Sequence, residues 1–231
     1  MAMFIIKPWY RKIGFDPNDY FNPTTHIATE ENFIKLLQAG IYTSDVIGYK
    51  VQLSNSVDYN NGLWVIADVN HDSTNTGQTN CYDLISLDCF HKTDYSGYSP
   101  KWRDTSCIAR TWLNNTFYPG FSTEFKNHIL KPKYKSQSTW YTNDKVILPS
   151  YKEVNGGTSS YQDNEGVAYP IFTDNASRKK YQTGTTSYGF WWTRSLFTYN
   201  GSYVWYVSTN GSMNSESYGA NRYLTPLLRI S

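Results

Sequence analysis

Three oxygen-bearing side chains at alternate positions, Asp68, Asn70 and Asp72, are the pattern in this sequence closest to a metal site. A hard cation such as Ca²⁺ takes several oxygen ligands from one short loop, and calcium loops begin with this spacing. The loop then departs from that pattern, because Ser73 stands where glycine makes the sharp bend and Thr79 where a glutamate would bind through both oxygens. We therefore expect Asx-type turns here, and we predict neither a metal nor a cofactor.

The histidines and cysteines lack the spacings that support catalysis or metal binding. No two histidines have helical metal spacing, and an odd number of cysteines without a CxxC pair favours buried free thiols. The chain has no GxSxG elbow, no phosphate-binding glycine loop and no dinucleotide fingerprint, although spacing alone leaves Cys–His catalysis open. We predict that the protein is not an enzyme. The histidines and cysteines that were considered are His26, His71, His91, His128, Cys81, Cys89 and Cys107.

The stretch from Tyr199 to Tyr223 has the composition of a recognition surface. Of its 25 residues, 17 are Tyr, Asn, Ser or Gly. Tyrosine supplies rigid amphipathic contact area and the small polar residues supply adaptable hydrogen bonds, whereas low-complexity disorder is the alternative. Because apolar strand cores interrupt the stretch, we favour the surface. We predict these ligand-binding residues: Tyr199, Asn200, Ser202, Tyr203, Trp205, Asn210, Ser212, Asn214, Ser217, Tyr218, Asn221 and Tyr223.

Neighbouring residues separate core from surface in this region. Tyrosines flanked by Asn, Ser and Gly (Tyr199, Tyr203, Tyr218 and Tyr223) are predicted to be exposed. Arg194, alone in an apolar strand end, is predicted to form an internal ion pair or to clamp carbonyls, and contact with a ligand is its alternative role. The residues predicted to lie in the core are Trp191, Trp192, Val204, Val207, Leu227 and Ile230.

These side chains need a scaffold, and the periodicity of the chain predicts one of mixed type. Thr29 caps a helix from Glu30 to Ala39, and a YNNG turn joins two strands between Val46 and Val69. The segments 104–117 and 122–130 have helical periodicity with a YPGF turn between them. Further strands are predicted in 81–90 and 144–154, before a Gly/Ser/Asn-rich loop, and at Phe190–Trp192, Tyr203–Val207 and Leu224–Ile230.

Composition limits the classes of partner. A chain of 231 residues with 17% aromatic and 17% charged residues is long enough for a sizeable core, and its net charge of +2 gives no reason to expect nucleic acid. No apolar run could insert in a membrane, and the run Phe4–Ile6 is too short for the core of a cleaved signal. We expect residues 1–45 to form an extended arm with a short helix, for attachment or oligomerisation, followed by a ligand-binding domain over 46–231.

Several motifs occur in an order that is fairly specific: LWVIADVNHDSTNT, YDLIS, ARTWLNNTFYPGFS, DKVILPS, FWWTRS, YVWYVSTNGS and YLTPLLRI. From Val46 onward the chain resembles a bacterial and phage domain of unknown function, often found as the variable protein of diversity-generating retroelements and similar to the phage major tropism determinant. The resemblance implies an α+β, C-type-lectin-like fold, shared with formylglycine-generating enzymes, with small antiparallel sheets and two helices. It also implies a variable ligand-binding segment over 197–223, in which adenine-directed mutagenesis favours Asn, Tyr and Ser codons.

The sequence departs from the relatives in three places. YLTP replaces a GVRP-like motif, the calcium-dependent EPN and WND motifs are absent, and no cysteine follows Cys107, where the enzymes of this fold carry theirs. The resemblance therefore implies an adhesin for a host-surface protein or glycan, on a virion or phage tail surface, or else a cytoplasmic protein without a signal peptide. A structural particle or envelope protein that uses the same surface for subunit packing is the alternative, and an enzyme with other catalytic residues is a third possibility.

Overall fold

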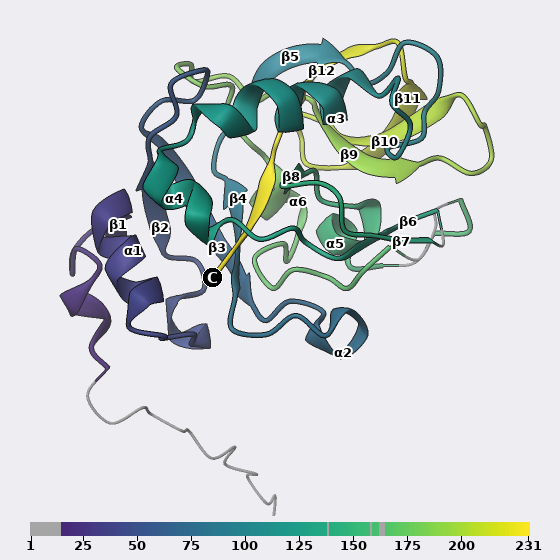
Figure 1. The fold of residues 1–231 in the computed structure, drawn as a ribbon. Coiled ribbons are helices and arrows are strands. Elements are labelled where there is room, and N and C mark those ends of the chain that lie inside the picture. Colours follow the sequence, from purple (N-terminus) through teal and green to yellow (C-terminus); the bar gives the residue numbers. More distant parts are fainter. Residues whose placement is uncertain (1–14, 138, 158, 162–164) are drawn as a thin grey trace, which may run out of the picture.

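Two β-sheets that share one core form the centre of the molecule, with short helices around them (Figure 1). The computed structural model describes residues 15–137, 139–157, 159–161 and 165–231. This part of the chain has an α+β architecture, as predicted.

The larger sheet has the strand order β1-β2-β3-β4-β13-β8. Its predicted hairpin is confirmed, because β2 and β3 are antiparallel with Val51 opposite Trp64. The sheets were expected to be antiparallel, but strand β1 pairs with β2 in parallel. The strands are β1 Ile27–Thr29, β2 Lys50–Leu53, β3 Gly62–Val69, β4 Tyr82–Ser86, β8 Val146–Ile147 and β13 Leu227–Ile230.

The smaller sheet, in the order β11-β10-β9-β12-β5, carries the C-terminal aromatic segment. The prediction of one strand over Leu224–Ile230 was wrong, because the chain leaves this sheet after Leu224 and enters the larger one at Leu227. Pro226 lies at the break and has no N–H for a ladder. The strands are β5 Phe90–Asp94, β9 Trp191–Leu196, β10 Tyr203–Val207, β11 Met213–Ser217 and β12 Asn221–Leu224, and a separate hairpin pairs β6 Tyr134–Ser136 with β7 Thr139–Tyr141.

The three predicted helices are all present, with the ends moved by a few residues. Thr29 caps α1 and Ser122 caps α4, each through its side-chain oxygen. The helix predicted within 104–117 is an α-helical turn followed by a π-helical one, and Ile108, expected on its apolar face, is exposed. The helices are α1 Glu30–Gln38, α2 Ser73–Thr76, α3 Ile108–Trp112, η3 Leu113–Phe117, α4 Thr123–His128, α5 Tyr151–Asn155 and α6 Asn175–Arg178, with 3₁₀ turns η1 Pro17–Asp19, η2 Ser44–Val46 and η4 Tyr118–Gly120.

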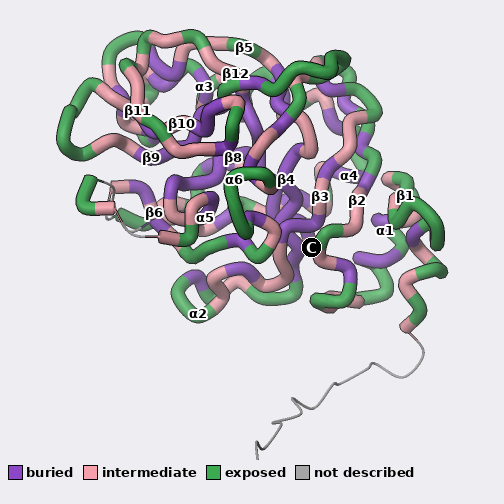
Figure 2. Tube along the Cα trace, turned by 180° about the vertical axis from the view of Figure 1, so that it is seen from behind, coloured by how far each residue is buried: buried purple, intermediate pink, exposed green. Residues whose placement is uncertain are grey.

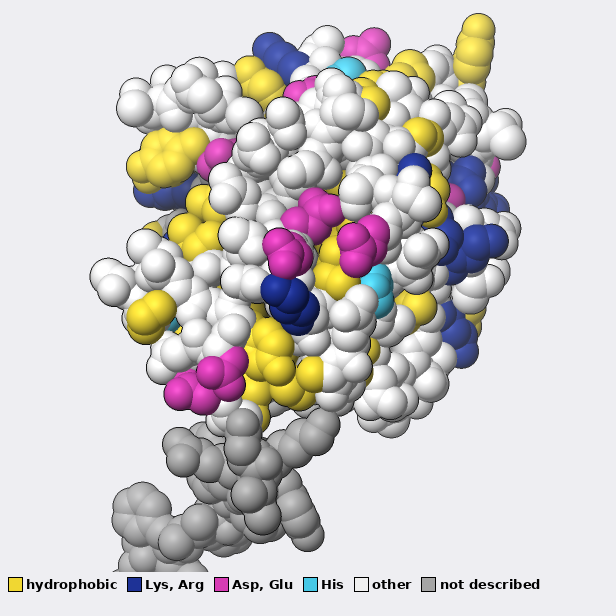
Figure 3. Space-filling view, turned by 60° about the vertical axis from the view of Figure 1, so that its left-hand side comes forward, with side chains coloured by type: hydrophobic (Ala, Val, Ile, Leu, Met, Phe, Trp, Pro, Cys, Tyr) yellow, Lys and Arg dark blue, Asp and Glu magenta, His cyan; other side chains and the backbone are white. Residues whose placement is uncertain are grey.

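The segment before Val46 packs against the rest of the chain wherever the structure describes it. Phe21 and Phe33 belong to the same core as the sheets, and β1 extends the larger sheet. Figure 3 shows the face on this side of the molecule, where acidic and basic side chains meet near the centre and hydrophobic ones form small scattered patches. The domain boundary at 45/46 and the attachment role stay predictions, and residues 1–14 of the expected arm lie outside the described residues.

The core is rich in aromatic side chains and runs through both sheets (Figure 2). Trp191, Trp192, Val204, Val207 and their predicted companions are at most 1% exposed, which confirms that assignment. Each such aromatic side chain contributes on the order of 2 kcal/mol through burial. None of the helices in the described part of the chain combines the length and the apolar composition needed to cross a bilayer.

Lys180 is a buried cation between the two sheets. Its ammonium donates to the carbonyls of Ser86 (2.5 Å) and Leu87 (3.3 Å), and it lies near the rings of Phe172 and Trp191. Because burial disfavours the charged form, the pKa of Lys180 falls from the usual 10.5 to about 8. At neutral pH the fold therefore holds a charged group in a place that favours the neutral amine.

We expect the wild type to lose stability relative to Lys180→Met as the pH decreases from 10 to 7. The pKa of Lys180 is lower in the folded chain, so between about pH 8 and 10.5 the unfolded chain binds more protons and wild-type stability rises with pH. The variant lacks this contribution, while both chains share all other titrating groups. Urea unfolding of both proteins at pH 7, 8, 9 and 10 measures the difference, and a gap that does not change with pH would contradict the assignment.

Candidate ligand-binding surface

The connection between β9 and β10 is a tight hairpin tip formed by residues 197–203. Phe197 N–H donates to the Tyr203 carbonyl (2.9 Å) and Tyr203 N–H donates to the Asn200 carbonyl (2.9 Å). The Asn200 side chain accepts a further hydrogen bond from Ser202 N–H (3.0 Å), which makes an Asx turn. These bonds give the tip one defined backbone conformation, with Tyr199 at its apex.

Five aromatic side chains gather at this tip, and we call them the aromatic surface: Tyr161, Phe197, Tyr199, Tyr203 and Trp205. The ring centroid of Tyr161 lies 5.3 Å from that of Tyr199 and 5.5 Å from that of Phe197. Phe197 contacts Trp205 edge to face at 5.0 Å, and Tyr203 at 6.4 Å. Tyr199 is 77% exposed and Tyr161 44% exposed, so the cluster offers aromatic area to solvent from a fixed base.

Trp205 forms the floor of the aromatic surface. It is only 9% exposed, packs on the Tyr151 ring at 4.4 Å, and donates its indole N–H to the Tyr161 carbonyl (3.2 Å). Thr198 N–H donates to the same carbonyl (2.9 Å). Its side chain ties the Tyr161 loop to β10. The nearly buried position does not favour direct contact with a ligand, and that role of Trp205 stays a prediction.

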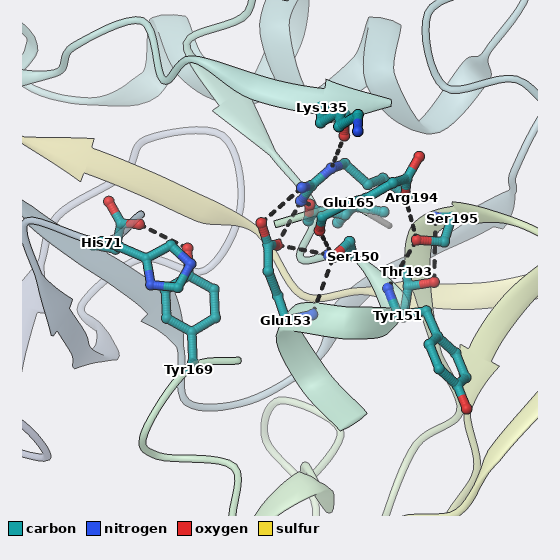
Figure 4. A network of polar contacts seen from close by, with 12 residues as sticks. His71, Lys135, Ser150, Tyr151, Glu153, Glu165, Tyr169, Thr193, Arg194 and Ser195 are labelled. Carbon is teal, nitrogen blue, oxygen red and sulfur yellow. Dashed lines mark hydrogen bonds and ion pairs between the residues drawn. The ribbon is translucent and has the colours of Figure 1, made fainter. Parts of the chain in front are cut away.

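A buried polar network joins β9 to α5 (Figure 4). Tyr151 of α5 packs on Trp205 of the aromatic surface. Ser150 and Glu153 form a reciprocal capping box at the start of α5. Tyr151 N–H donates to Ser195 Oγ (2.8 Å), and that hydroxyl donates to Glu165, which is fully buried. Because each member is held by two or more elements, the strand that leads into the hairpin tip cannot shift independently of the helix.

Arg194 and Glu153 form the ion pair at the centre of this network. Two guanidinium nitrogens of Arg194 lie 2.6 and 2.7 Å from the two carboxylate oxygens of Glu153, and Nη1 also donates to the Leu148 carbonyl (2.8 Å). Burial alone would lower the pKa of Arg194, but the charge and hydrogen bonds of Glu153, together with the charge of Glu165, outweigh burial and hold that pKa above its usual value. Both predicted roles, internal ion pair and carbonyl clamp, are confirmed.

The structure divides the other predicted ligand-binding residues among three places. Ser217 lies opposite Tyr203 across the β10–β11 ladder, and Tyr218 N–H donates to Ser202 at the hairpin tip. Asn210, Ser212 and Asn214 lie at the opposite end of β10, about 13 Å away for a five-residue strand. On β12, Asn221 pairs with Asp94 and Tyr223 donates its hydroxyl to Gln182 (2.7 Å).

Exposure follows this division only in part. Tyr199, Asn200 and Ser202 are exposed as predicted, whereas Tyr203, Tyr218 and Tyr223, predicted to be exposed, are half-buried. Two members of the aromatic surface were absent from the predicted set, namely Tyr161 and Phe197. Tyr161 stands in the segment SSYQDN, which has the same Tyr/Ser/Asn composition as the C-terminal stretch, and that composition could have indicated it.

The residues weighed for metal binding and catalysis have structural partners. Asn70 Oδ1 accepts from Cys81 N–H (3.2 Å), Asp68 is bonded to the His71 ring (2.8 Å), and Asp72 accepts from the Asn75 side chain (2.5 Å). None of these bonds goes to the backbone N–H two residues on, so they are not the Asx turns that were expected here. Within the described ranges no three His, Cys, Asp or Glu side chains come close enough to share a metal ion. Burial raises the pKa of Cys89 to about 12, so this thiol stays protonated at neutral pH.

Comparison with known proteins gives one match. Residues 84–231 match the model of a family described as a domain of unknown function, DUF6273. That stretch contains the last three residues of β4, strands β8 and β13, all strands of the smaller sheet and the whole aromatic surface. It contains none of β1, β2, β3 and α1. No curated protein and no solved structure matches the chain.

Proposed function

The chain belongs to the DUF6273 family, and we propose that it is a non-enzymatic binding protein that recognises a host-surface protein or glycan through the aromatic surface. The observation that carries this proposal is the exposed pair Tyr199, at the hairpin tip, and Tyr161, in the loop that Trp205 ties to β10, above a buried ion-pair network. Exposed aromatic side chains on a rigid base lose little conformational entropy on binding. Asn200 and Ser202 beside them supply hydrogen-bonding groups.

We expect Tyr199→Ala and Tyr161→Ala each to weaken binding to the recognised cells about tenfold or more, the effect of removing a binding hot spot. Fluorescently labelled protein, titrated onto a panel of bacterial cells and read by flow cytometry, gives the apparent affinity. Tyr181→Ala is the matched control, because Tyr181 is 45% exposed, like Tyr161, but does not belong to the aromatic surface. Tyr181 comes before β9 in the chain, whereas the hairpin tip comes after β9. Equal losses in the control, or no loss in either variant, would refute the aromatic surface.

The finer part of the proposal is a C-type-lectin-like fold whose segment 197–223 is diversified by a retroelement. The exposed loop positions of Tyr199, Asn200 and Asn210 support it, since substitutions there disturb no core contact. Deep sequencing of the gene's 3′ end in a growing population of its source tests it. Substitutions confined to adenines in these codons are expected, and an invariant segment would leave a binder of fixed specificity. An experimental structure superposed on C-type-lectin domains tests the fold.

Subunit packing in a particle or envelope is the second candidate, and one observation favours it. Tyr181 and Tyr188 stack at 4.5 Å and are 45% and 37% exposed, with the Lys179 ammonium 5.3 Å from the Tyr188 ring. This second patch suits a contact between subunits. Loss of assembly in Tyr181→Ala, measured by light scattering, would support the structural role, whereas loss of cell binding with intact assembly in Tyr199→Ala supports recognition on a virion or tail surface.

A further inference from the structure

A cavity of about 330 Å³ lies away from the aromatic surface, between the α3–η3 helix and the turn before β8. Its walls come from residues 105–115 on one side and from Asn143 and Asp144 on the other. The volume is at the lower end of the range of small-molecule sites, about 300–1,000 Å³. None of its lining residues belongs to the aromatic surface or to the network beneath it.

The ion pair of Arg110 and Asp144 lines this cavity and sets its charge. Arg110 Nε and Nη2 lie 2.9 Å from Asp144 Oδ1, and Asp144 is 3% exposed. Asp144 also accepts from the Trp102 indole (3.2 Å) and the Tyr134 hydroxyl (2.5 Å), so its oxygens are fully used. The pair is neutral as a whole, and the other lining side chains carry no charge. A charged ligand would therefore find no counter-charge in the cavity.

Arg110, which lines the cavity, still has hydrogen-bonding capacity. A guanidinium has five N–H groups, and in the described chain one from Nε, one from Nη2 and one from Nη1 are used, the last by the Arg103 carbonyl (3.3 Å). Two N–H donors remain on a side chain that is 20% exposed and held in place by Asp144. Donors fixed in this way bind an acceptor oxygen with little loss of side-chain entropy.

Amide and hydroxyl side chains complete the wall. The amide of Asn114 has no hydrogen-bonding group left for a ligand. Its nitrogen donates to the carbonyls of Arg110 and Val146, and its oxygen accepts from Val146 N–H, which fixes the helix against β8. Asn115 and Asn143 are exposed, and neither amide has a hydrogen-bond partner among the described residues. The π-helical turn that carries Asn114 and Asn115 is a feature found often at functional sites.

We propose that this cavity binds a neutral, polyhydroxylated small molecule, the size of one sugar ring, independently of the aromatic surface. An apolar ligand is disfavoured because no lining residue is hydrophobic, and an anion or cation because the one ion pair is internally neutralised. Hydroxyl groups both donate and accept, so they match amides, hydroxyls and the two spare Arg110 N–H groups together. The site needs no metal ion, and its ligands are all side chains of this chain.

Titration of the ¹⁵N-labelled protein with D-glucose, D-galactose and D-mannose at millimolar concentrations tests the proposal. We expect at least one hexose to shift the side-chain amide signals of Asn115 and Asn143 in a saturable way. Asn115→Ala/Asn143→Ala is expected to weaken that binding about tenfold, the value of one or two hydrogen bonds. Asn60→Ala/Asn127→Ala removes two exposed asparagine amides elsewhere and is expected to leave it unchanged.

Three results would overturn the proposal. These are the absence of saturable shifts with any of the three hexoses, equal weakening in both double variants, and tighter binding of inorganic phosphate than of the hexoses. Both double variants replace exposed side chains, so their urea unfolding curves serve as the check that the fold is intact. Tyr199→Ala should bind the hexose as the wild type does, which separates this site from the proposed function.

Discussion

Arg194→Met is expected to lower the free energy of unfolding by about 3–5 kcal/mol, the usual cost of removing one partner from a buried ion pair. Arg194 and Glu153 are 1% and 5% exposed, so the variant would leave the Glu153 carboxylate buried without its cation. Capping bonds to the start of α5 would remain, but they do not neutralise the charge. The expected loss is a large fraction of the stability of an ordinary domain. Urea unfolding followed by tryptophan fluorescence measures it.

Two further variants test whether the uncompensated charge causes this loss. Arg194→Met/Glu153→Gln removes the stranded charge and keeps a capping amide, so we expect it to recover more than half of the loss. Arg222→Met breaks the pair with Glu216, which remains partly in contact with solvent, and is expected to cost at most about 1 kcal/mol. If the double variant were no more stable than Arg194→Met, packing rather than charge would account for the effect.

Gly211→Ala is expected to destabilise the protein by several kcal/mol and to displace the β10–β11 turn. Gly211 has φ +84°, which favours glycine, and an added Cβ would lie 1.7 Å from the carbonyl oxygen of Asn175. The obstacle is backbone, which cannot rotate away as a side chain could. The Gly211 carbonyl also accepts from Arg178 Nε (3.0 Å). A shifted turn would break that bond and leave the buried Nε–H of Arg178 without its acceptor.

Gly201→Ala is the control for this substitution. Gly201 lies in the hairpin tip, has no atom within 4 Å of an added Cβ and has no positive φ. We expect its unfolding midpoint to stay within experimental error of the wild type or to rise slightly, because alanine restricts the unfolded chain. Urea unfolding and backbone amide chemical shifts measure both variants. A Gly211→Ala protein with wild-type stability and an unmoved Asn175 would contradict the close approach.

Local signals predicted the elements whose conformation depends on neighbouring residues. Asn61 in the YNNG turn adopts φ 54° as such turns require, and the Thr29 cap fixes the start of α1. Helix α5 escaped prediction although Ser150 and Glu153 have the spacing of a capping box, because five residues are too few for a periodic pattern. Strand β11 is mostly polar, and its pairing depends on β10 rather than on its own residues.

The candidate site could be predicted in composition but not in geometry. Trp205 and Val204 are both buried because the β9–β10 register shifts at this point, and no alternation in the sequence indicates such a bulge. Tyr161 joins the aromatic surface through a contact across some forty residues of chain, which sequence spacing cannot show. The split of the predicted residues between two ends of β10 likewise depends on strand direction in the sheet.

The place of β13 in the larger sheet bears on the order in which the chain folds. Strand β13 fills the gap between β4 and β8, and its Arg229 pairs with Asp83 across 146 residues of sequence. Closing such a loop is entropically slow, whereas β9, β10 and β11 are joined by short turns and can pair early. We therefore expect the rate-limiting contacts to lie outside the segment that carries the aromatic surface. Substitutions at its exposed tips should then leave the slow step untouched, and the surface could change while the chain still reaches its native state.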